Sequence, residues 1–206
     1  RVRDGRSFAT RRVVAQQKGR TIFTMMASFH APEAGSFSHQ HGMPPAPPPE
    51  GLRNETALRQ AQAHQLPAGW RGEKHPPIEY RMVDPVDLLH PVPRPADIQL
   101  WLRACAAVSD DPVMHRALLA YASDHGLLRA ALLPHGLSFM QPAMRGASLD
   151  HAMWFHRDFR IDDWLLYCID SPSAGGARAL CRGEIYTRDG QLAVSVAQEG
   201  MLRVAA

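Results

Sequence analysis

Residues 148–156 read Ser-Leu-Asp-His-Ala-Met-Trp-Phe-His, and with the later triplet Gln198-Glu199-Gly200 they indicate the fold more clearly than any other part of the chain. Successive side chains of a β-strand point to opposite faces. With that period, one face is mostly apolar and typical of a strand on a core: Leu149, His151, Met153 and Phe155. The other face is more polar: Ser148, Asp150, Ala152, Trp154 and His156. We therefore predict a strand over residues 147–157, with a core face and a face suited to a site.

One helix and several more strands are predicted around this stretch. Asp111-Pro112 favours a helix start, because Asp caps the first turn and Pro fits the first helical position. Gly126 is expected to end the helix, whose apolar pattern is Met114, Leu118, Leu119 and Tyr121. The other strand candidates cover residues 78–82, 98–108 (with Leu100 and Leu102 on one face), 163–171, 177–187 and 191–203. A helix followed by consecutive antiparallel strands predicts an α+β fold in which the sheet wraps the helix.

Two hairpins far apart in the sequence share one plan. The first is predicted from residues 8–14 and 21–29 around a Gln17-Lys18-Gly19 turn. The second is predicted from residues 179–186 and 192–196 around Arg188-Asp189-Gly190. Aligning Gly19 with Gly190 places Ala27 opposite Gln198. The likeness is open to two interpretations, a repeated domain or a coincidence between two generic hairpins.

The organisation of the chain follows from these hairpins and from the proline content between them. Residues 2–7 already resemble the middle of a hairpin, so we expect preceding strands to be missing and the chain to be a fragment. Residues 31–50 hold six prolines, which favours an extended linker. A short helix is expected over residues 55–64, and Pro76-Pro77 marks the start of the next domain. The predicted division is residues 1–32, the last strands of a truncated first domain; 33–76, a Pro-rich linker with a short helix; and 77–206, a complete second domain.

Composition excludes several classes of function. The formal net charge is +3 and no run of basic residues is present, so nucleic-acid binding is not expected. No apolar run reaches the roughly 18 residues that cross a bilayer, and no signal peptide is evident, so we expect a cytoplasmic protein without a membrane segment. The three cysteines have neither metal nor redox spacing and are expected to be buried thiols. The pairs His39/His41 and His151/His156 lack a third ligand, so no metal site is predicted.

The motifs resemble those of the type II acyl-CoA thioesterases, bacterial thioesterase II and its peroxisomal relatives. The resemblance rests on residues 148–156, on Gln198-Glu199-Gly200 and on residues 27–35, which match the start of the family's linker. It implies a double hotdog fold, in which an antiparallel sheet wraps a central helix, with the first hotdog incomplete. It also implies hydrolysis of fatty acyl-CoA to free fatty acid and coenzyme A without a cofactor, in a homo-oligomer.

The same resemblance implies three catalytic residues, namely Asp124, Ser148 and Gln198. Ser148 stands where some relatives carry Thr, which keeps the hydroxyl group and removes a methyl. A carboxylate can accept a proton from water while a hydroxyl and an amide orient the reactants, so no covalent acyl-enzyme is required. Gly126 beside the helix end would allow a backbone approach to the substrate.

Each of these residues also has an ordinary structural interpretation. An Asp at a helix end is commonly solvated, a Ser at a strand start commonly bonds its own backbone, and a Gln at a strand end commonly faces water. We expect Asp150 to bond the backbone near the site and His151 to be a buried histidine with its hydrogen bonds satisfied. Trp154 and Phe155 are expected to lie in the core.

Two other functions are compatible with the sequence. Asp110 and His115 have the five-residue spacing of the acid and base of hotdog-fold enoyl-CoA hydratases, although the Asn-Pro order of the hydratase motif is absent. The chain could also be a non-catalytic acyl-CoA-binding or interaction domain.

Overall fold

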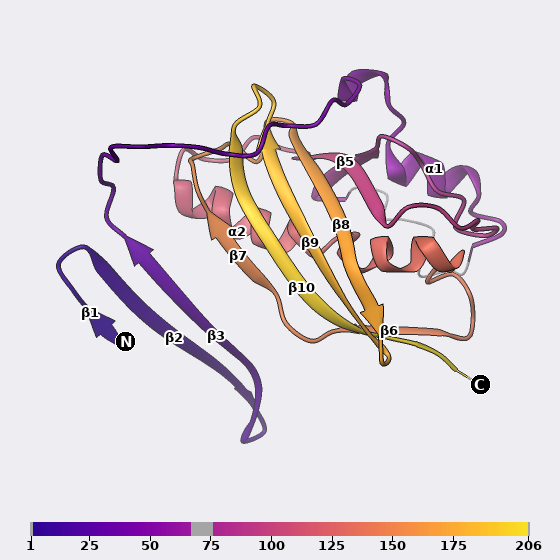
Figure 1. Ribbon diagram of the computed structural model, residues 1–206, viewed down its shortest axis with the longest axis horizontal. Coiled ribbons are helices and arrows are strands. Elements are labelled where there is room, and N and C mark those ends of the chain that lie inside the picture. The colour runs from indigo at the N-terminus through magenta and orange to yellow at the C-terminus, as the bar shows by residue number, and fades with distance from the viewer. Residues whose placement is uncertain (1, 67–75, 206) are drawn as a thin grey trace. The chain divides into compact units, whose positions relative to one another are not determined.

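The computed structural model describes residues 2–66 and 76–205, and the chain divides into two compact units, residues 1–39 and 40–206. The first unit is a three-stranded antiparallel sheet in the order β1-β2-β3 (Figure 1). Its strands are β1 (Arg3–Asp4), β2 (Phe8–Gln17) and β3 (Arg20–His30). Lys18 and Gly19 both have positive φ, at 49° and 75°, as a two-residue hairpin turn of the primed type requires. The predicted first hairpin is confirmed.

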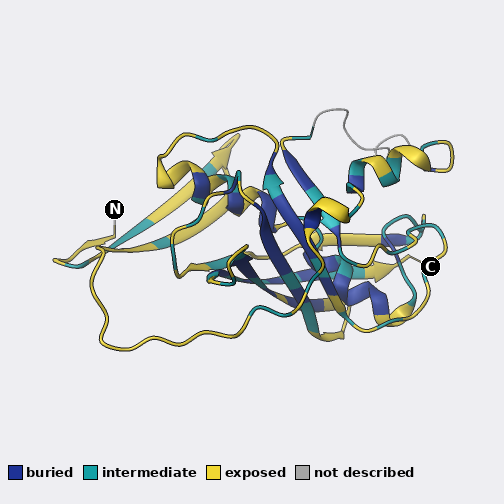
Figure 2. Ribbon diagram, turned by 90° about the horizontal axis from the view of Figure 1, so that it is seen from above, coloured by how far each residue is buried: buried dark blue, intermediate teal, exposed yellow. Residues whose placement is uncertain are grey.

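The strands of the first unit expose many large apolar side chains. Figure 2 shows β2 and β3 mostly in the colour of exposed residues. The exposed side chains are Phe8, Val13, Val14, Ile22, Phe23, Met25, Met26 and Phe29. An apolar surface of this extent is typical of a face that another element covers.

The second unit is built on a seven-stranded antiparallel sheet. The strand order is β4-β5-β8-β9-β10-β6, and β7 also pairs with β10 (Figure 1). The strands are β4 (Ile78–Met82), β5 (Asp97–Ala104), β6 (Met144–Ser148), β7 (Ala152–Phe155), β8 (Leu165–Gly175), β9 (Arg178–Thr187) and β10 (Leu192–Val204). The second predicted hairpin is therefore β9-β10, and Gly190 in its turn has a φ of 89°. The strand expected over residues 98–108 ends at Ala104.

Two helices pack on one face of this sheet and close the core. They are α2 (Pro112–Ser123) and the 3-10 helix η3 (Leu127–His135), which lie behind the strands in Figure 1. The predicted start of α2 is confirmed, because the Asp111 side chain accepts a hydrogen bond from Val113 N at 2.9 Å. The core gathers apolar side chains from the helices, from β5, β8, β9 and β10 and from the loop before β8, among them Leu100, Leu102, Leu119, Leu127, Ile161, Leu165, Ile185 and Val194. The predicted α+β arrangement is confirmed.

The buried face of α2 is rotated from the one predicted. Met114 and Tyr121 are 45% and 66% exposed, whereas the buried residues of the helix are His115, Leu119, Ala122 and Ser123. These four residues have the helical spacing i, i+4, i+7 and i+8, so they form one continuous stripe. The stripe includes the polar residues His115 and Ser123. The positions of the apolar residues alone therefore do not identify the buried face of the helix.

The strand predicted over residues 147–157 is two strands separated by a bulge. Ser148 in β6 pairs with Gly200 and Ala152 in β7 pairs with Ala197, so three residues oppose two on β10. One extra residue in a ladder reverses which face the following side chains occupy. The period-two assignment across this stretch is therefore wrong, and Leu149 is 56% exposed.

The second half of the Pro-rich segment is packed against the sheet. We call residues 40–52, which include the 3-10 turn η1 (Pro49–Gly51), the strap. Its apolar residues pack on a cluster on the outer face of the sheet that includes Trp101 and Trp164. Trp101 Nε1 donates a hydrogen bond to Pro47 O at 2.9 Å. The strap leads into α1 (Glu55–Ala61), the predicted short helix, which begins at an Asn54 cap.

Gly183 in β9 allows a close approach that a larger residue would prevent. A Cβ atom at this position would lie 3.0 Å from Cζ of the fully buried Tyr167 and closer still to Cε2. We expect Gly183→Ala to lower the free energy of unfolding by about 1–3 kcal/mol, the usual cost of overpacking a core. Gly175→Ala is the matched control, because no atom lies within 4 Å of a Cβ there. Thermal unfolding checks the pair, and equal melting temperatures would contradict the prediction.

Two further findings concern the sequence expectations. No helix among residues 2–66 and 76–205 is long and apolar enough to cross a membrane. All three cysteines are free thiols, with Cys181 buried and Cys168 partly buried, but Cys105 is exposed, contrary to prediction.

Candidate active site

Asp124, Ser148 and Gln198 come together from three separate elements. Asp124 directly follows α2, Ser148 ends β6, and Gln198 lies within β10. Gln198 Nε2 donates a hydrogen bond to Asp124 Oδ1 at 2.6 Å, and Ser148 Oγ donates to the same oxygen at 3.5 Å. Asp124 and Ser148 are open to solvent, whereas Gln198 is only 1% exposed. Gln198 does not take the ordinary alternative of facing water, because it is buried and its amide bonds the carboxylate of Asp124.

The bulge between β6 and β7 determines where Ser148 lies. Asp150 Oδ1 accepts a hydrogen bond from Glu199 N at 2.7 Å, and Leu149 N donates to Glu199 O at 2.9 Å. The Asp150 side chain thus accepts the hydrogen bond of a β10 backbone amide at the point where the regular ladder is interrupted. Its predicted role in bonding the backbone is confirmed. Bulges commonly redirect side chains next to functional sites. This bulge directly follows Ser148 in the chain, and Gln198 lies opposite it on β10.

Two tyrosines, the partly buried Tyr80 and the fully buried Tyr167, fix the end of α2 from which Asp124 projects. Tyr80 OH donates to Ala122 O at 3.2 Å, and Tyr167 OH donates to Ser123 O at 2.9 Å. Burial raises the pKa of both phenols, so both keep the proton that they donate. The last carbonyl groups of a helix have no partner within the helix. Here side chains from β4 and β8 satisfy two of them and set the backbone next to Asp124.

A buried ionic cluster includes His125, the residue that follows Asp124, and no sequence pattern pointed to it. Glu55 of α1 is 7% exposed and bonds Arg59 at 2.8 Å, Arg129 at 2.7 Å and His125 Nε2 at 2.8 Å. Burial disfavours its charge, but the Arg129 guanidinium, the His125 bond and Arg59 together hold the pKa of Glu55 far below its usual range. Burial lowers the pKa of His125. The only local signal was the helix start at Asn54, which gives no indication of what Glu55 contacts.

The remaining residues of the motif are placed differently from expectation. His151 is exposed rather than buried, although its Nε2 and Ser123 Oγ are hydrogen-bonded at 2.9 Å. Partial desolvation lowers the pKa of His151, and the carboxylates of Asp124 and Asp150 act in the opposite direction. Trp154 and Phe155 are 54% and 41% exposed, because they lie on the far side of the bulge at the edge of the sheet. They are not core residues.

Gly126 has the backbone conformation that its position requires. Its φ is 86°, a region that residues with a Cβ rarely adopt. A Cβ there would meet Leu100 Cδ2 at 3.7 Å, so the open side of this glycine faces the core. The glycine serves the turn between α2 and η3.

The hydratase-like pair Asp110 and His115 is occupied by other contacts. The Asp110 side chain is 95% exposed and forms an ion pair with Arg160 at 2.7 Å. His115 is 4% exposed, and its Nδ1 accepts a hydrogen bond from Ile161 N at 3.1 Å. Each residue thus serves the local structure around Ile161.

The histidine pairs considered as metal ligands are engaged separately. His156 Nε2 and Ser195 Oγ are hydrogen-bonded at 2.9 Å, and His41 Nδ1 lies 2.7 Å from Glu184 Oε1. Within the described ranges, no group of three or more His, Cys, Asp or Glu residues is arranged to hold a metal ion.

An apolar pocket opens next to the buried ionic cluster. Glu55, Arg59 and Arg129 form part of its wall. The apolar part of the wall comes from α1, β4, β5, η3 and the loops beside them, and includes Leu58, Met82, Val86, Leu132, Leu133 and Phe139. Because Glu55 also bonds His125, the pocket wall is connected to the residue that follows Asp124.

Comparison with known proteins assigns the chain to a family. Residues 78–201 match the family described as acyl-CoA thioesterase. The chain is 39% identical over 213 residues to acyl-coenzyme A thioesterase 8 of Mus musculus, an alignment covering 99% of this chain and 66% of that protein. It therefore spans slightly less than two thirds of that relative's length.

Similar solved structures agree with the assignment to this family and identify the fold. The crystal structure of the acyl-CoA thioesterase II TesB2 from Mycobacterium marinum shares 45% identity and a TM-score of 0.79, covering 100% of this chain and 72% of that one. A protein with a hotdog fold from Alicyclobacillus acidocaldarius gives a TM-score of 0.76 at 18% identity, covering 100% and 71%. The fold of this chain is thus an α+β hotdog fold, as predicted. Because residues 78–201 match the family and the likeness to the Mus musculus relative covers nearly the whole chain, the chain belongs to the acyl-CoA thioesterase family.

Proposed function

We propose that this chain hydrolyses fatty acyl-CoA thioesters to free fatty acid and coenzyme A at Asp124, Ser148 and Gln198. The observation that carries the proposal is the convergence of a hydroxyl and a buried amide on one oxygen of an exposed carboxylate, in a member of this family. Both bonds reach Oδ1, and among the described residues no side chain bonds Oδ2. Oδ2 is therefore available to accept a proton from water.

The proposed reaction is a direct attack by water. Asp124 accepts one proton from a water molecule as the water oxygen bonds the thioester carbonyl carbon. The tetrahedral intermediate then collapses, the C–S bond breaks with its electron pair on sulfur, and the coenzyme A thiolate takes up the proton held by Asp124, which restores the carboxylate. Ser148 orients the water through the free lone pairs of its hydroxyl, and Gln198 fixes the carboxylate. General-base assistance of this kind contributes roughly a hundred- to ten-thousandfold in rate.

The alternatives have less support. A hydratase would need Asp110 and His115 to act on one substrate, yet one is exposed and paired with Arg160 and the other is buried and bonds a backbone amide. A non-catalytic acyl-CoA-binding domain would give no reason for the buried amide of Gln198 to hold an exposed carboxylate.

The organisation of the protein is part of the same proposal. We retain residues 1–32 as strands of a first hotdog, 33–76 as a linker and 77–206 as the catalytic hotdog, acting in a cytoplasmic homo-oligomer. The exposed apolar side chains of β2 and β3 support association, because such a surface is normally covered.

Release of free thiol from acyl-CoA esters of increasing chain length tests the proposed activity. We expect the chain to release thiol from at least part of such a panel, and Asp110→Asn to do so at an unchanged rate. A folded protein that releases no thiol from any ester would refute the thioesterase proposal. Loss of activity in Asp110→Asn would instead favour the hydratase-like pair.

We further propose that the apolar pocket receives the acyl chain, since most of its wall is apolar and Glu55 in that wall bonds His125, the residue that follows Asp124. Val86→Trp narrows this pocket. We expect it to lower kcat/KM for long acyl chains about tenfold, comparable to the loss of contacts with one or two methylenes, and to leave the shortest esters nearly unaffected. Val92→Trp is the control, because Val92 is 68% exposed and is not among the pocket-lining residues. A uniform effect on all chain lengths would contradict this use of the pocket.

A further inference from the structure

We infer that Glu55, supplied by the linker helix α1, is a positioning residue that holds the catalytic Asp124 in place through His125. The inference rests on the proposed function, because it assigns Asp124 the role of the base. It gives the segment before the catalytic hotdog a part in the chemistry beyond that of a spacer.

The contact between Glu55 and His125 is direct and buried. Glu55 Oε2 lies 2.8 Å from His125 Nε2, and a carboxylate that only accepts requires that this nitrogen carry the proton. The other oxygen of Glu55 is bonded by Arg59 and Arg129. A buried carboxylate with three partners has little freedom to move, so it is a fixed point for the imidazole.

The ring of His125 is held on its face as well as at its nitrogen. It stacks on Tyr80 with ring centroids 3.9 Å apart and planes 19° from parallel. The hydroxyl of Tyr80 in turn bonds Ala122 O, and His125 N donates to the same carbonyl at 3.2 Å. Ala122 and His125, which stand before and after Asp124 in the chain, are therefore both held by Tyr80.

Gly126 makes this restraint necessary. It follows His125 and adopts a left-handed conformation with φ of 86°. Glycine imposes the weakest restraint on the backbone, so the helix end before it depends on side-chain contacts for its position. The Glu55 bond adds a side-chain restraint at His125, the residue between Asp124 and this glycine.

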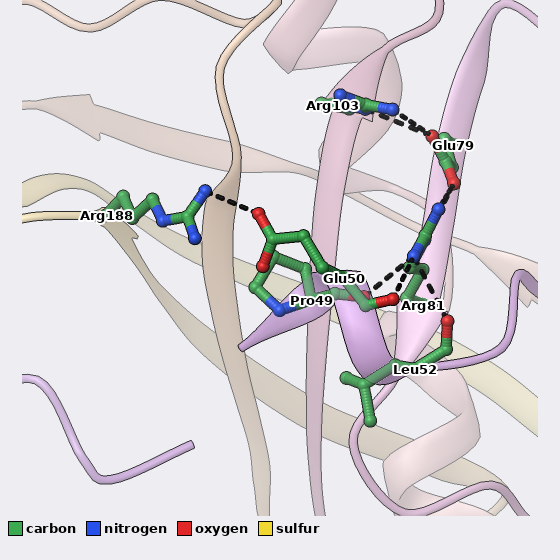
Figure 3. Close-up of polar contacts among 7 residues, drawn as sticks. All are labelled: Pro49, Glu50, Leu52, Glu79, Arg81, Arg103 and Arg188. Atoms are coloured by element: carbon green, nitrogen blue, oxygen red, sulfur yellow. Dashed lines mark hydrogen bonds and ion pairs between the residues drawn. The ribbon is translucent and has the colours of Figure 1, made fainter. Parts of the chain in front are cut away.

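The position of α1 is itself fixed, because the strap before it is clamped to the sheet. Figure 3 shows Arg81 reaching from β4 to the strap, with Nη1 donating to Pro49 O at 2.8 Å and to Leu52 O at 3.2 Å. Glu79 accepts from both Arg81 Nε and Arg103 and holds the arginine in that direction. Arg188 bonds Glu50 at 2.7 Å from the far side. These contacts fix the strap on the sheet, and the strap in turn fixes the position of α1 and of Glu55.

Glu55→Gln tests the inference with little change in shape. The amide has one neutral accepting oxygen in place of two charged ones, so the bond to His125 Nε2 is weakened, while the stacking on Tyr80 and the 3.1 Å contact with Arg129 Nη2 remain. We expect kcat to fall about tenfold while KM changes less than twofold, because small displacements of a catalytic group cost rate more than binding. His125→Phe keeps the ring on Tyr80 and removes the hydrogen bond, and we expect a similar fall. The double variant should lose little more than either single variant, since both remove one connection.

Glu33→Gln is the matched control. Glu33 Oε2 lies 3.2 Å from His30 Nε2, and both side chains are exposed. The substitution therefore removes the same type of contact at an exposed position. We expect its kcat to equal that of the unchanged chain. A kcat for Glu55→Gln within twofold of this control, at a temperature where both are folded, would overturn the inference, as would additive effects in the double variant.

Hydrogen exchange separates failure of this inference from failure of the proposed function. If the unchanged chain hydrolyses no thioester, the proposed function fails, and the amides of residues 122–126 still report whether Glu55 orders this segment. We expect their exchange to quicken in Glu55→Gln and not in Glu33→Gln. Exchange that is equal in the two variants would overturn the positioning role whatever the activity.

Discussion

Asp124→Asn is expected to lower kcat for acyl-CoA hydrolysis by about 10²–10⁴-fold, the contribution of a positioned general base. The substitution keeps the size of the side chain, and the amide oxygen can still accept the hydrogen bond from Gln198. It removes only the capacity to take a proton from water. KM is expected to change little, because the carboxylate acts on water and not on the bound thioester. Steady-state thiol release measures both constants.

Asp110→Asn is the control for this substitution, since it makes the same chemical change at a fully solvated aspartate beside Arg160. Its kcat should equal that of the unchanged chain. If Asp124→Asn retains more than about a tenth of the activity, a loss smaller than any general base supplies, Asp124 is not the base.

Gln198→Leu is expected to lower kcat about 100-fold with little change in stability. The substitution removes the 2.6 Å bond to Asp124, and a hydrogen bond to a charged group contributes about 1.5–3 kcal/mol, which corresponds to roughly 10- to 150-fold in rate. Gln198 Oε1 is buried and has no hydrogen-bond partner among the described residues. Burying a polar atom without a partner costs free energy, so replacement by an apolar residue of similar size removes a destabilising feature. Loss of the bond to Asp124 and removal of the unpartnered oxygen act on stability in opposite directions, so the melting temperature is expected to change little.

Gln191→Leu provides the comparison at an exposed site. Gln191 Nε2 donates to Asp189 Oδ2 at 2.8 Å in the β9-β10 turn, so the same amide-carboxylate bond is removed away from Asp124. We expect no change in kcat there. A parallel fall in melting temperature and activity in Gln198→Leu would indicate that Gln198 only supports the fold.

Local signals in the sequence were sufficient for the turns, the helix start and the order of the elements. Asp111-Pro112 encodes its helix start within two residues, and Gly19 and Gly190 mark turns whose φ angles demand them. Asp150 was also placed correctly, because its short side chain can only bond nearby backbone. The meeting of Asp124, Ser148 and Gln198 was expected from family resemblance and not from spacing, since the three residues lie on separate elements far apart in the sequence.

The sequence did not reveal features that depend on long-range contacts. The bulge at residues 149–151 depends on a bond from β10 to Asp150, so a period-two reading of one strand could not find it. The buried face of α2 includes two polar residues whose partners lie elsewhere in the chain. The role of Glu55 depends on its contacts in the folded chain with Arg129 of η3 and with His125. His125 is 70 residues away in the sequence, so no local pattern indicates the contact. Proline density suggested a spacer, whereas the strap is packed on the sheet.

A single turnover in water enriched in ¹⁸O, with the chain in excess over an acyl-CoA ester that it hydrolyses, tests the central claim most directly. Mass spectrometry of the released fatty acid and of the intact protein gives the result. Direct attack by water beside Asp124 predicts one ¹⁸O atom in the acid from this first turnover and no acylated protein at any time. Unlabelled acid together with a protein heavier by one acyl group would show that a side chain of the enzyme attacks first, and would contradict the account.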